Sequence, residues 1–80
     1  MKQINIHYYA LLREQRGCGD ETIGTTAATA ADLYHELRER HRFTLGIELL
    51  KVVVNAQIRT WNTILNDGDT VVFLPPVAGG

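Results

Sequence analysis

Two prolines, Pro75 and Pro76, directly follow the last apolar segment of the chain and set the point at which any sheet must end. Proline has a fixed φ and no N–H to donate, so it is excluded from the interior of a sheet. The preceding residues 70–74 form a short, almost wholly apolar run that is typical of a buried β-strand. Residues 75–80 are therefore predicted to form a flexible tail, which at about 3.3 Å per residue can extend roughly 20 Å from the folded body.

The tail ends in two glycines, Gly79 and Gly80, and carries no side chain capable of acid–base or nucleophilic chemistry. Its one reactive group is the terminal carboxylate of Gly80. Because glycine has no Cβ, such an end can enter a narrow channel and expose the carboxylate to a partner's active site. Once activated, for example as an acyl-adenylate, the carboxylate accepts sulfur or an amine. A frayed terminus without a role is the alternative, but the preceding strand and proline pair favour a functional end.

The composition is that of one small globular domain, predicted to span residues 1–80. The chain is 45% hydrophobic with a net charge of −1, and no basic patch indicates a nucleic-acid partner. A single cysteine excludes an internal disulfide framework and is typical of a reducing cytoplasm. No apolar run is long enough to span a membrane, and no signal peptide is predicted.

Alternating residues predict strands at both ends of the chain. In residues 3–10, the side chains expected on the core side are Ile4, Ile6, Tyr8 and Ala10. Residues 11–16 are interpreted as a turn or short helical segment, followed by a tight Gly-rich connection and a second strand over 21–25. Further strands are predicted over 50–55, 58–60 and 70–74, with Leu65 as a core anchor and a turn at 66–69.

One helix is predicted between the second and third strands. Thr29 is the expected N-cap, Asp32 occupies the capping-box position, and the helix should end near His41. Glu36 and Arg40 form an i,i+4 pair on its polar face. The apolar positions at helical spacing are Ala30, Leu33, Tyr34 and Leu37.

The element order ββαβββ predicts an α+β fold, a mixed sheet with one helix across one face and the first and last strands as parallel neighbours in the middle. The other face is then open to partners. Val71 and Phe73 belong to the helix side, so Val72 and Leu74 are expected to point outward and to form a docking surface with the base of the tail.

Several motifs carry a resemblance to a known family. They are Tyr8-Tyr9-Ala10-Leu11-Leu12-Arg13-Glu14 before Gly17, Val54-Asn55, Asn66-Asp67-Gly68-Asp69, and the closing Phe73-Leu74-Pro75-Pro76-Val77-Ala78-Gly79-Gly80. In this order they resemble the small, sulfur-carrying subunits of molybdopterin synthase, which have a ubiquitin-like β-grasp fold. The Pro-Pro-Val-x-Gly-Gly end is the most specific piece, because a bare Gly-Gly is shared with thiamine-pathway carriers and ubiquitin-like modifiers.

The resemblance implies a mechanism and partners. An ATP-dependent activating enzyme would adenylate Gly80, and a sulfur donor would convert the adenylate to a thiocarboxylate. The tail would then enter the large subunit of molybdopterin synthase, in a heterotetramer of two small and two large subunits, and give its sulfur to a cyclic pyranopterin precursor of the molybdenum cofactor. The implied protein is cytoplasmic, not catalytic by itself, and binds no cofactor permanently. The implied partner-binding residues are Val72, Leu74, Pro75, Pro76, Val77, Ala78 and Gly79.

Other functions remain open on the residues alone. A carrier for thiamine or thionucleoside synthesis would share the tail chemistry, and a ubiquitin-like modifier would join Gly80 to a lysine. A plain interaction module would not need the two glycines at all.

Other residues whose side chains could take part in catalysis or metal binding are interpreted as structural. Cys18 is taken as a plain loop cysteine, and the three histidines as surface residues without metal-ligand spacing. Asp67 and Asp69 flank a turn glycine, and Phe43 and Trp61 are assigned to the edge of the core.

Overall fold

One mixed sheet and one long helix dominate the part of the chain that the structure, a computed structural model, describes, which is residues 1–76. The strands are β1 (Lys2–Tyr8), β2 (Asp20–Thr25), β3 (Lys51–Val54), β4 (Gln57–Arg59) and β5 (Thr70–Leu74), and the helices are α1 (Ala10–Arg16), α2 (Ala30–His41) and the 3₁₀ turn η1 (Ile47–Leu49). The predicted order ββαβββ is confirmed, with α1 in the segment interpreted as a turn or short helix.

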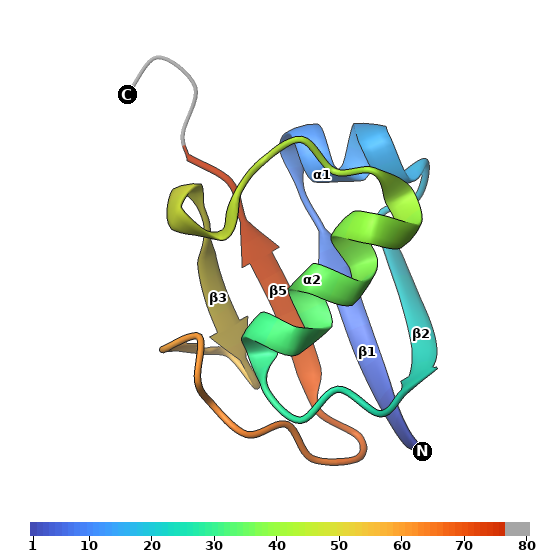
Figure 1. Cartoon of the computed structure of the whole chain (residues 1–80), viewed down its shortest axis with the longest axis vertical. Coiled ribbons are helices and arrows are strands. Elements are labelled where there is room, and N and C mark those ends of the chain that lie inside the picture. The colour runs from blue at the N-terminus through green and yellow to red at the C-terminus, as the bar shows by residue number, and fades with distance from the viewer. Residues whose placement is uncertain (77–80) are drawn as a thin grey trace.

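The sheet is organised around the parallel pair of β1 and β5 at its centre (Figure 1). The strand order is β2-β1-β5-β3-β4, and the other three pairings are antiparallel. Ile6 lies opposite Val71, and Tyr8 lies opposite Phe73. The prediction that the first and last strands are parallel neighbours is therefore confirmed.

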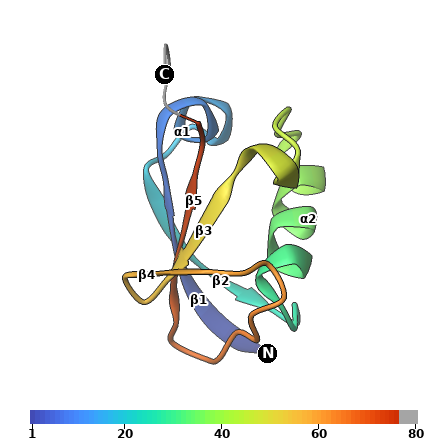
Figure 2. The same cartoon turned by 90° about the vertical axis from the view of Figure 1, so that its left-hand side faces the viewer.

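Helix α2 crosses one face of this sheet (Figure 2). Its start is fixed by Thr29, whose side chain accepts a hydrogen bond from the backbone N–H of Asp32 at 3.2 Å. It ends at His41, because the next residue, Arg42, adopts a left-handed conformation with φ 58°. The four predicted apolar positions, Ala30, Leu33, Tyr34 and Leu37, are all buried.

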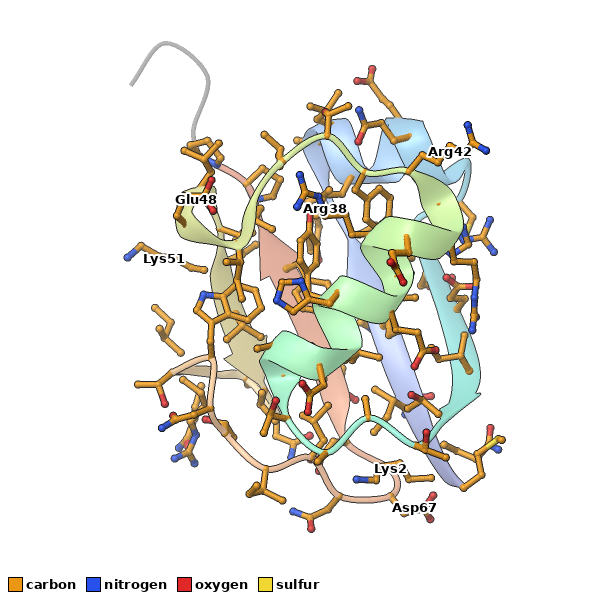
Figure 3. All side chains as sticks on the ribbon, in the orientation of Figure 1. Lys2, Arg38, Arg42, Glu48, Lys51 and Asp67 are labelled. Carbon is orange, nitrogen blue, oxygen red and sulfur yellow. The ribbon has the colours of Figure 1, made fainter. Side chains whose placement is uncertain are left out.

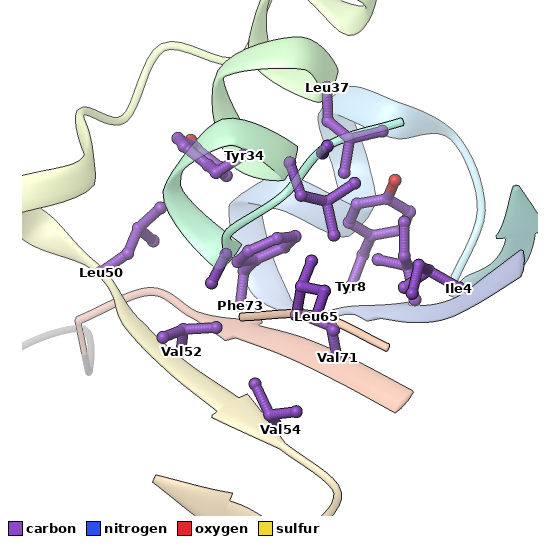
Figure 4. Close-up of a cluster of buried hydrophobic side chains, with 14 of the residues drawn as sticks. Ile4, Tyr8, Tyr34, Leu37, Leu50, Val52, Val54, Leu65, Val71 and Phe73 are labelled. Atoms are coloured by element: carbon purple, nitrogen blue, oxygen red, sulfur yellow. The ribbon is translucent and has the colours of Figure 1, made fainter. Parts of the chain in front are cut away.

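The core lies between α2 and the sheet (Figure 4). Phe73 of β5 packs edge-on against Tyr34 at 5.1 Å between ring centroids and stacks on Trp61 at 5.9 Å. Leu65 is buried, as predicted, whereas Phe43, which was assigned to the edge of the core, is buried within it against Tyr8 and Tyr34. Because burial of one large apolar side chain contributes about 1.5–3 kcal/mol, Phe73 anchors the strand from which the tail departs.

One predicted core position is wrong. Ala10 is exposed and opens α1 with φ 51°, so the alternation of β1 stops at Tyr8. The chain turns at this point into a helix with a different period, and Leu12 becomes the buried residue of that helix.

Candidate functional site

The base of the tail lies where the two central strands end. Because β1 and β5 are parallel, both lead the chain to the same end of the sheet, where β1 continues into α1 and β5 reaches the two prolines (Figure 1). Pro75 is half-buried and Pro76 is exposed. The remaining tail residues of the predicted site, Val77, Ala78, Gly79 and Gly80, lie outside the described residues.

The sheet face opposite α2 carries no helix within residues 1–76 (Figure 2), and we call it the free sheet face. Cross-strand pairing lines up His7, Val72, Val53 and Ile58 in one row, with Asp20 opposite His7. Val72 and Val53 are half-buried, whereas the side chain of Ile58 is 70% exposed. The outward orientation predicted for Val72 is confirmed, and its role in docking stays a prediction.

A groove of about 340 Å³ adjoins both the free sheet face and the base of the tail. Its lining residues are Glu48, Leu49, Leu50, Lys51, Leu74, Pro75 and Pro76. Leu74 and Lys51 are cross-strand partners, so both side chains point to the free sheet face. Leu49 is 51% exposed. Three residues of the predicted docking set, Leu74, Pro75 and Pro76, are thus brought together in one hollow.

The sequence analysis did not predict that Leu49 and Lys51 line the groove or that Ile58 lies on the free sheet face. Alternation within residues 50–55 could have put Lys51 on the outward side. It could not have placed that residue beside Leu74, because the pairing of β3 with β5 joins segments far apart in the sequence.

A buried polar network fixes the corner where β1 passes into α1. The Tyr8 hydroxyl donates a hydrogen bond to Glu21 at 2.6 Å, and Arg16 donates two more to the same carboxylate at 2.8 and 2.9 Å. Hydrogen bonds from Arg16 and Tyr8 lower the pKa of Glu21 to about 2. Burial, with help from Glu21, raises the pKa of Tyr8. The network therefore carries a permanent ion pair at neutral pH and has no free group for acid–base chemistry.

His41 contradicts its interpretation as a surface residue. Its side chain is only 14% exposed, and its buried Nε2 lies 3.8 Å from Glu21 without a hydrogen-bond partner. Burial, together with the nearby guanidinium of Arg16, lowers the pKa of His41. The chain that follows α2 places Phe43 in the core, with its ring centroid 5.6 Å from that of His41, and this packing covers the imidazole.

The acidic turn is structural, as predicted. Asp69 accepts hydrogen bonds from the side chain of Asn55 at 2.9 Å and the backbone of Asn66 at 2.8 Å, and Asp67 accepts one from the backbone of Gln3 at 2.6 Å. Cys18 is half-buried against the core. Residues 1–76 contain no group of three or more potential metal ligands and no helix long and apolar enough to cross a membrane.

This arrangement, a five-stranded mixed sheet with one long helix across one face, is shared with known proteins. The model of the ThiS family matches residues 6–80. This chain belongs to the ThiS family. Two curated relatives are both named molybdopterin synthase sulfur carrier subunit. The one from Mycobacterium tuberculosis is 29% identical over 85 residues, which cover 100% of both chains, and the one from Escherichia coli is 31% identical over 80 residues, covering 96% of this chain and 99% of the relative.

Solved structures with similar architecture confirm the predicted ubiquitin-like β-grasp fold. A candidate molybdopterin converting factor subunit 1 from Pyrococcus furiosus is 29% identical, with a TM-score of 0.78 over 96% of this chain and 100% of that chain. Small archaeal modifier protein 1 of Haloferax volcanii is 18% identical, with a TM-score of 0.80 over 96% and 100%. A third neighbour, 22% identical with a TM-score of 0.67 over 98% and 99%, was solved in the complex of subunits 1 and 2 of the Helicobacter pylori molybdopterin-converting factor.

Proposed function

We propose that this ThiS-family chain is the sulfur-carrier subunit of a molybdopterin synthase. The observation that supports it most directly is the match over essentially the whole length to two sulfur carrier subunits of that enzyme. In this chain the match includes the proline pair, which ends the central strand β5, and the glycines of the tail.

The proposed reaction uses the carboxylate of Gly80. The carboxylate attacks the α-phosphate of ATP on an activating enzyme, which forms the acyl-adenylate and releases pyrophosphate. A sulfur donor then displaces AMP and leaves a terminal thiocarboxylate. In the large synthase subunit, sulfur passes to the pyranopterin precursor, and water restores the carboxylate. ATP is used only by the activating enzyme, the thiocarboxylate is transient, and no cofactor stays bound. The proposed pathway places the carrier in the cytoplasm.

The fold supports this chemistry by holding the base of the tail while leaving its end to the partner. Phe73 and Val71 are fully buried, so the last strand is fixed in the core. Pro75 and Pro76 then prevent any continuation of the sheet. The groove and the free sheet face provide docking area for the large subunit beside Leu74.

The test is the intact mass of the chain, made with its native end, after incubation with ATP, activating enzyme and sulfur donor. A thiocarboxylate replaces one oxygen by sulfur, and the mass should rise by that difference. Deletion of Gly80, or extension by one residue, should abolish the gain, because the terminal carboxylate itself reacts. Far-UV circular dichroism and the melting temperature should stay unchanged. A normal mass gain in the extended protein, with the extension still present, would refute the proposal.

Two alternatives are separated by the same measurement. A carrier for thiamine or thionucleoside synthesis would gain sulfur but fail to convert the pyranopterin precursor with the large synthase subunit. A protein modifier, which the shared fold with the archaeal modifier permits, would instead appear as whole-domain adducts on lysines of other proteins.

A further inference from the structure

The free sheet face is electrically asymmetric. Asp20 stands at the start of edge strand β2, and Lys51 stands at the start of β3. Between these strands lie β1 and β5, so the two charged residues are separated by roughly 15 Å, at about 4.8 Å per strand plus an offset of two residues along the strands.

Both charged residues point to the free sheet face. Lys51 is the cross-strand partner of Leu74, and Asp20 is the partner of His7, which in turn lies opposite Val72. The residues of this face therefore run from the acid Asp20, past His7, and across the apolar Val72 and Leu74 to the base Lys51. Figure 3 shows the Lys51 side chain directed away from the body of the molecule.

Neither of these two charged residues takes part in an ion pair within residues 1–76. Asp20 and Lys51 are exposed, and the ion pairs of residues 1–76 join other groups: Arg16 and His41 with Glu21, and Arg40 with Glu36. Glu48 lines the same groove as Lys51, but its carboxylate folds back against Gly46. Arg13 lies beside Gly19, next to Asp20, without pairing with it.

We propose that this face accepts its protein partner in one orientation, set by Asp20 on one side of the apolar strip and Lys51 on the other. This rests on the proposed function, because the partner is the large synthase subunit. That subunit would place an apolar surface over Val72, Leu74 and Val53, a cationic side chain toward Asp20 and an anionic side chain toward Lys51. Like charges brought together in the reversed orientation would repel, so the arrangement excludes it. The correct orientation directs the tail, which leaves from Leu74, into one site.

The test compares charge exchange on this face with charge exchange elsewhere. Binding of the purified full-length carrier to the purified large subunit is measured by calorimetry at low and high salt. The variants are Asp20→Lys, Lys51→Glu and the double exchange, which keeps the net charge at the wild-type value. The matched control is Glu39→Lys with Arg42→Glu, two exposed positions at the end of α2 on the opposite side of the sheet.

Each single reversal should weaken binding by about tenfold, and the double exchange by on the order of 100-fold, because each rim charge then faces its own sign. The differences should shrink toward 1 M salt, where the screening length falls to about 3 Å. The control exchange should bind within about twofold of wild type.

Two results would overturn the inference alone: wild-type affinity in the Asp20/Lys51 double exchange, or an equal loss in the control exchange. Both leave the proposed function intact as long as the wild-type carrier binds the large subunit and becomes thiocarboxylated. Failure of the wild-type carrier to bind the large subunit would remove the proposed function and, with it, this inference. Circular dichroism confirms that every variant is folded before binding is compared.

Discussion

At a few single residues, the backbone adopts a positive φ that glycine would tolerate better than the residue present. Within residues 1–76, the non-glycine residues with positive φ are Ala10, Arg42, Asn55 and Ala56. Asn55 and Ala56 form the two-residue turn between β3 and β4, and both have left-handed φ values of 51° and 69°. Asn-Gly is the preferred pair for such a turn, because glycine has no Cβ to clash in this conformation.

Ala56→Gly should therefore stabilise the fold. Relief of the left-handed conformation is worth about 1–2 kcal/mol, and the greater freedom of glycine in the unfolded chain offsets about 0.5–1 kcal/mol of it. A net gain of about 0.5 kcal/mol should raise the melting temperature by roughly 2–4 °C. Ala31→Gly in α2 is the control and should lower the melting temperature. A lower melting temperature in Ala56→Gly would show that this turn is not strained.

At the scale of elements, one corner of the fold is held by a polar network in addition to apolar packing. Glu21 of β2 accepts hydrogen bonds from Tyr8 of β1 and Arg16 of α1, and His41 of α2 packs 3.8 Å from the same carboxylate. The network thus ties four elements at the point where the chain turns toward the tail end of the sheet.

Glu21→Gln should destabilise the fold in a pH-dependent way. At pH 7 the loss should be about 1.5–3 kcal/mol, the range for hydrogen bonds to charged groups. The folded-state pKa of about 2 lies below the ordinary value of 4.5. The stabilisation by Glu21 is therefore present in full above pH 4.5 and is lost as the pH falls from there toward 2.

Urea titrations of wild type and variant at a series of pH values measure this difference. The exposed Glu39→Gln on α2 is the control and should change stability by less than about 0.5 kcal/mol. A Glu21→Gln loss that stays constant between pH 7 and pH 2 would mean that the carboxylate charge contributes nothing.

At the scale of the whole molecule, the two faces of the sheet differ in burial. On β5, Val71 and Phe73 are fully buried beneath α2, whereas Val72 and Leu74 are half-buried on the free sheet face. Alternate residues of one strand therefore lie on opposite faces, and we expect stability to depend on Val71 and Phe73 and docking to depend on Val72 and Leu74.

Leu74→Asp should weaken binding to the large subunit by more than tenfold while lowering the melting temperature by only a few degrees. The charge would enter an apolar groove that the partner must desolvate, whereas in the free carrier it meets solvent. Phe73→Asp, one residue away, is the contrast and should prevent folding, because it buries an unpaired charge in the core. Calorimetric binding and thermal melts provide both readouts. An equal loss of stability in the two variants would assign Leu74 to the core.

Short-range patterns were enough to predict the strands and the long helix, and they marked Gly80 as the candidate reactive residue. Period-two alternation, the Thr29 cap and helical spacing depend on neighbours within a few residues, so the strands, α2 and most of the core could be predicted from the chain alone. The prediction failed at Ala10, because the alternation of β1 ends there and helix α1 begins. It also failed at His41, because Phe43, which lies beyond the end of α2, packs over the imidazole. The end of β5 could also be predicted from neighbouring residues, because two prolines follow it directly.

Contacts between residues far apart in the sequence could not be predicted from such patterns. The row from Asp20 through His7 and Val72 to Ile58 exists because five strands pair in one register, and the groove beside Leu74 exists because η1 and β3 pack next to the tail base. The register is set by the burial of one whole face of the sheet against α2. A shift of a strand by one residue would turn each of its side chains to the opposite face. No local pattern contains that information, because the free energy that fixes the register comes from the complete core.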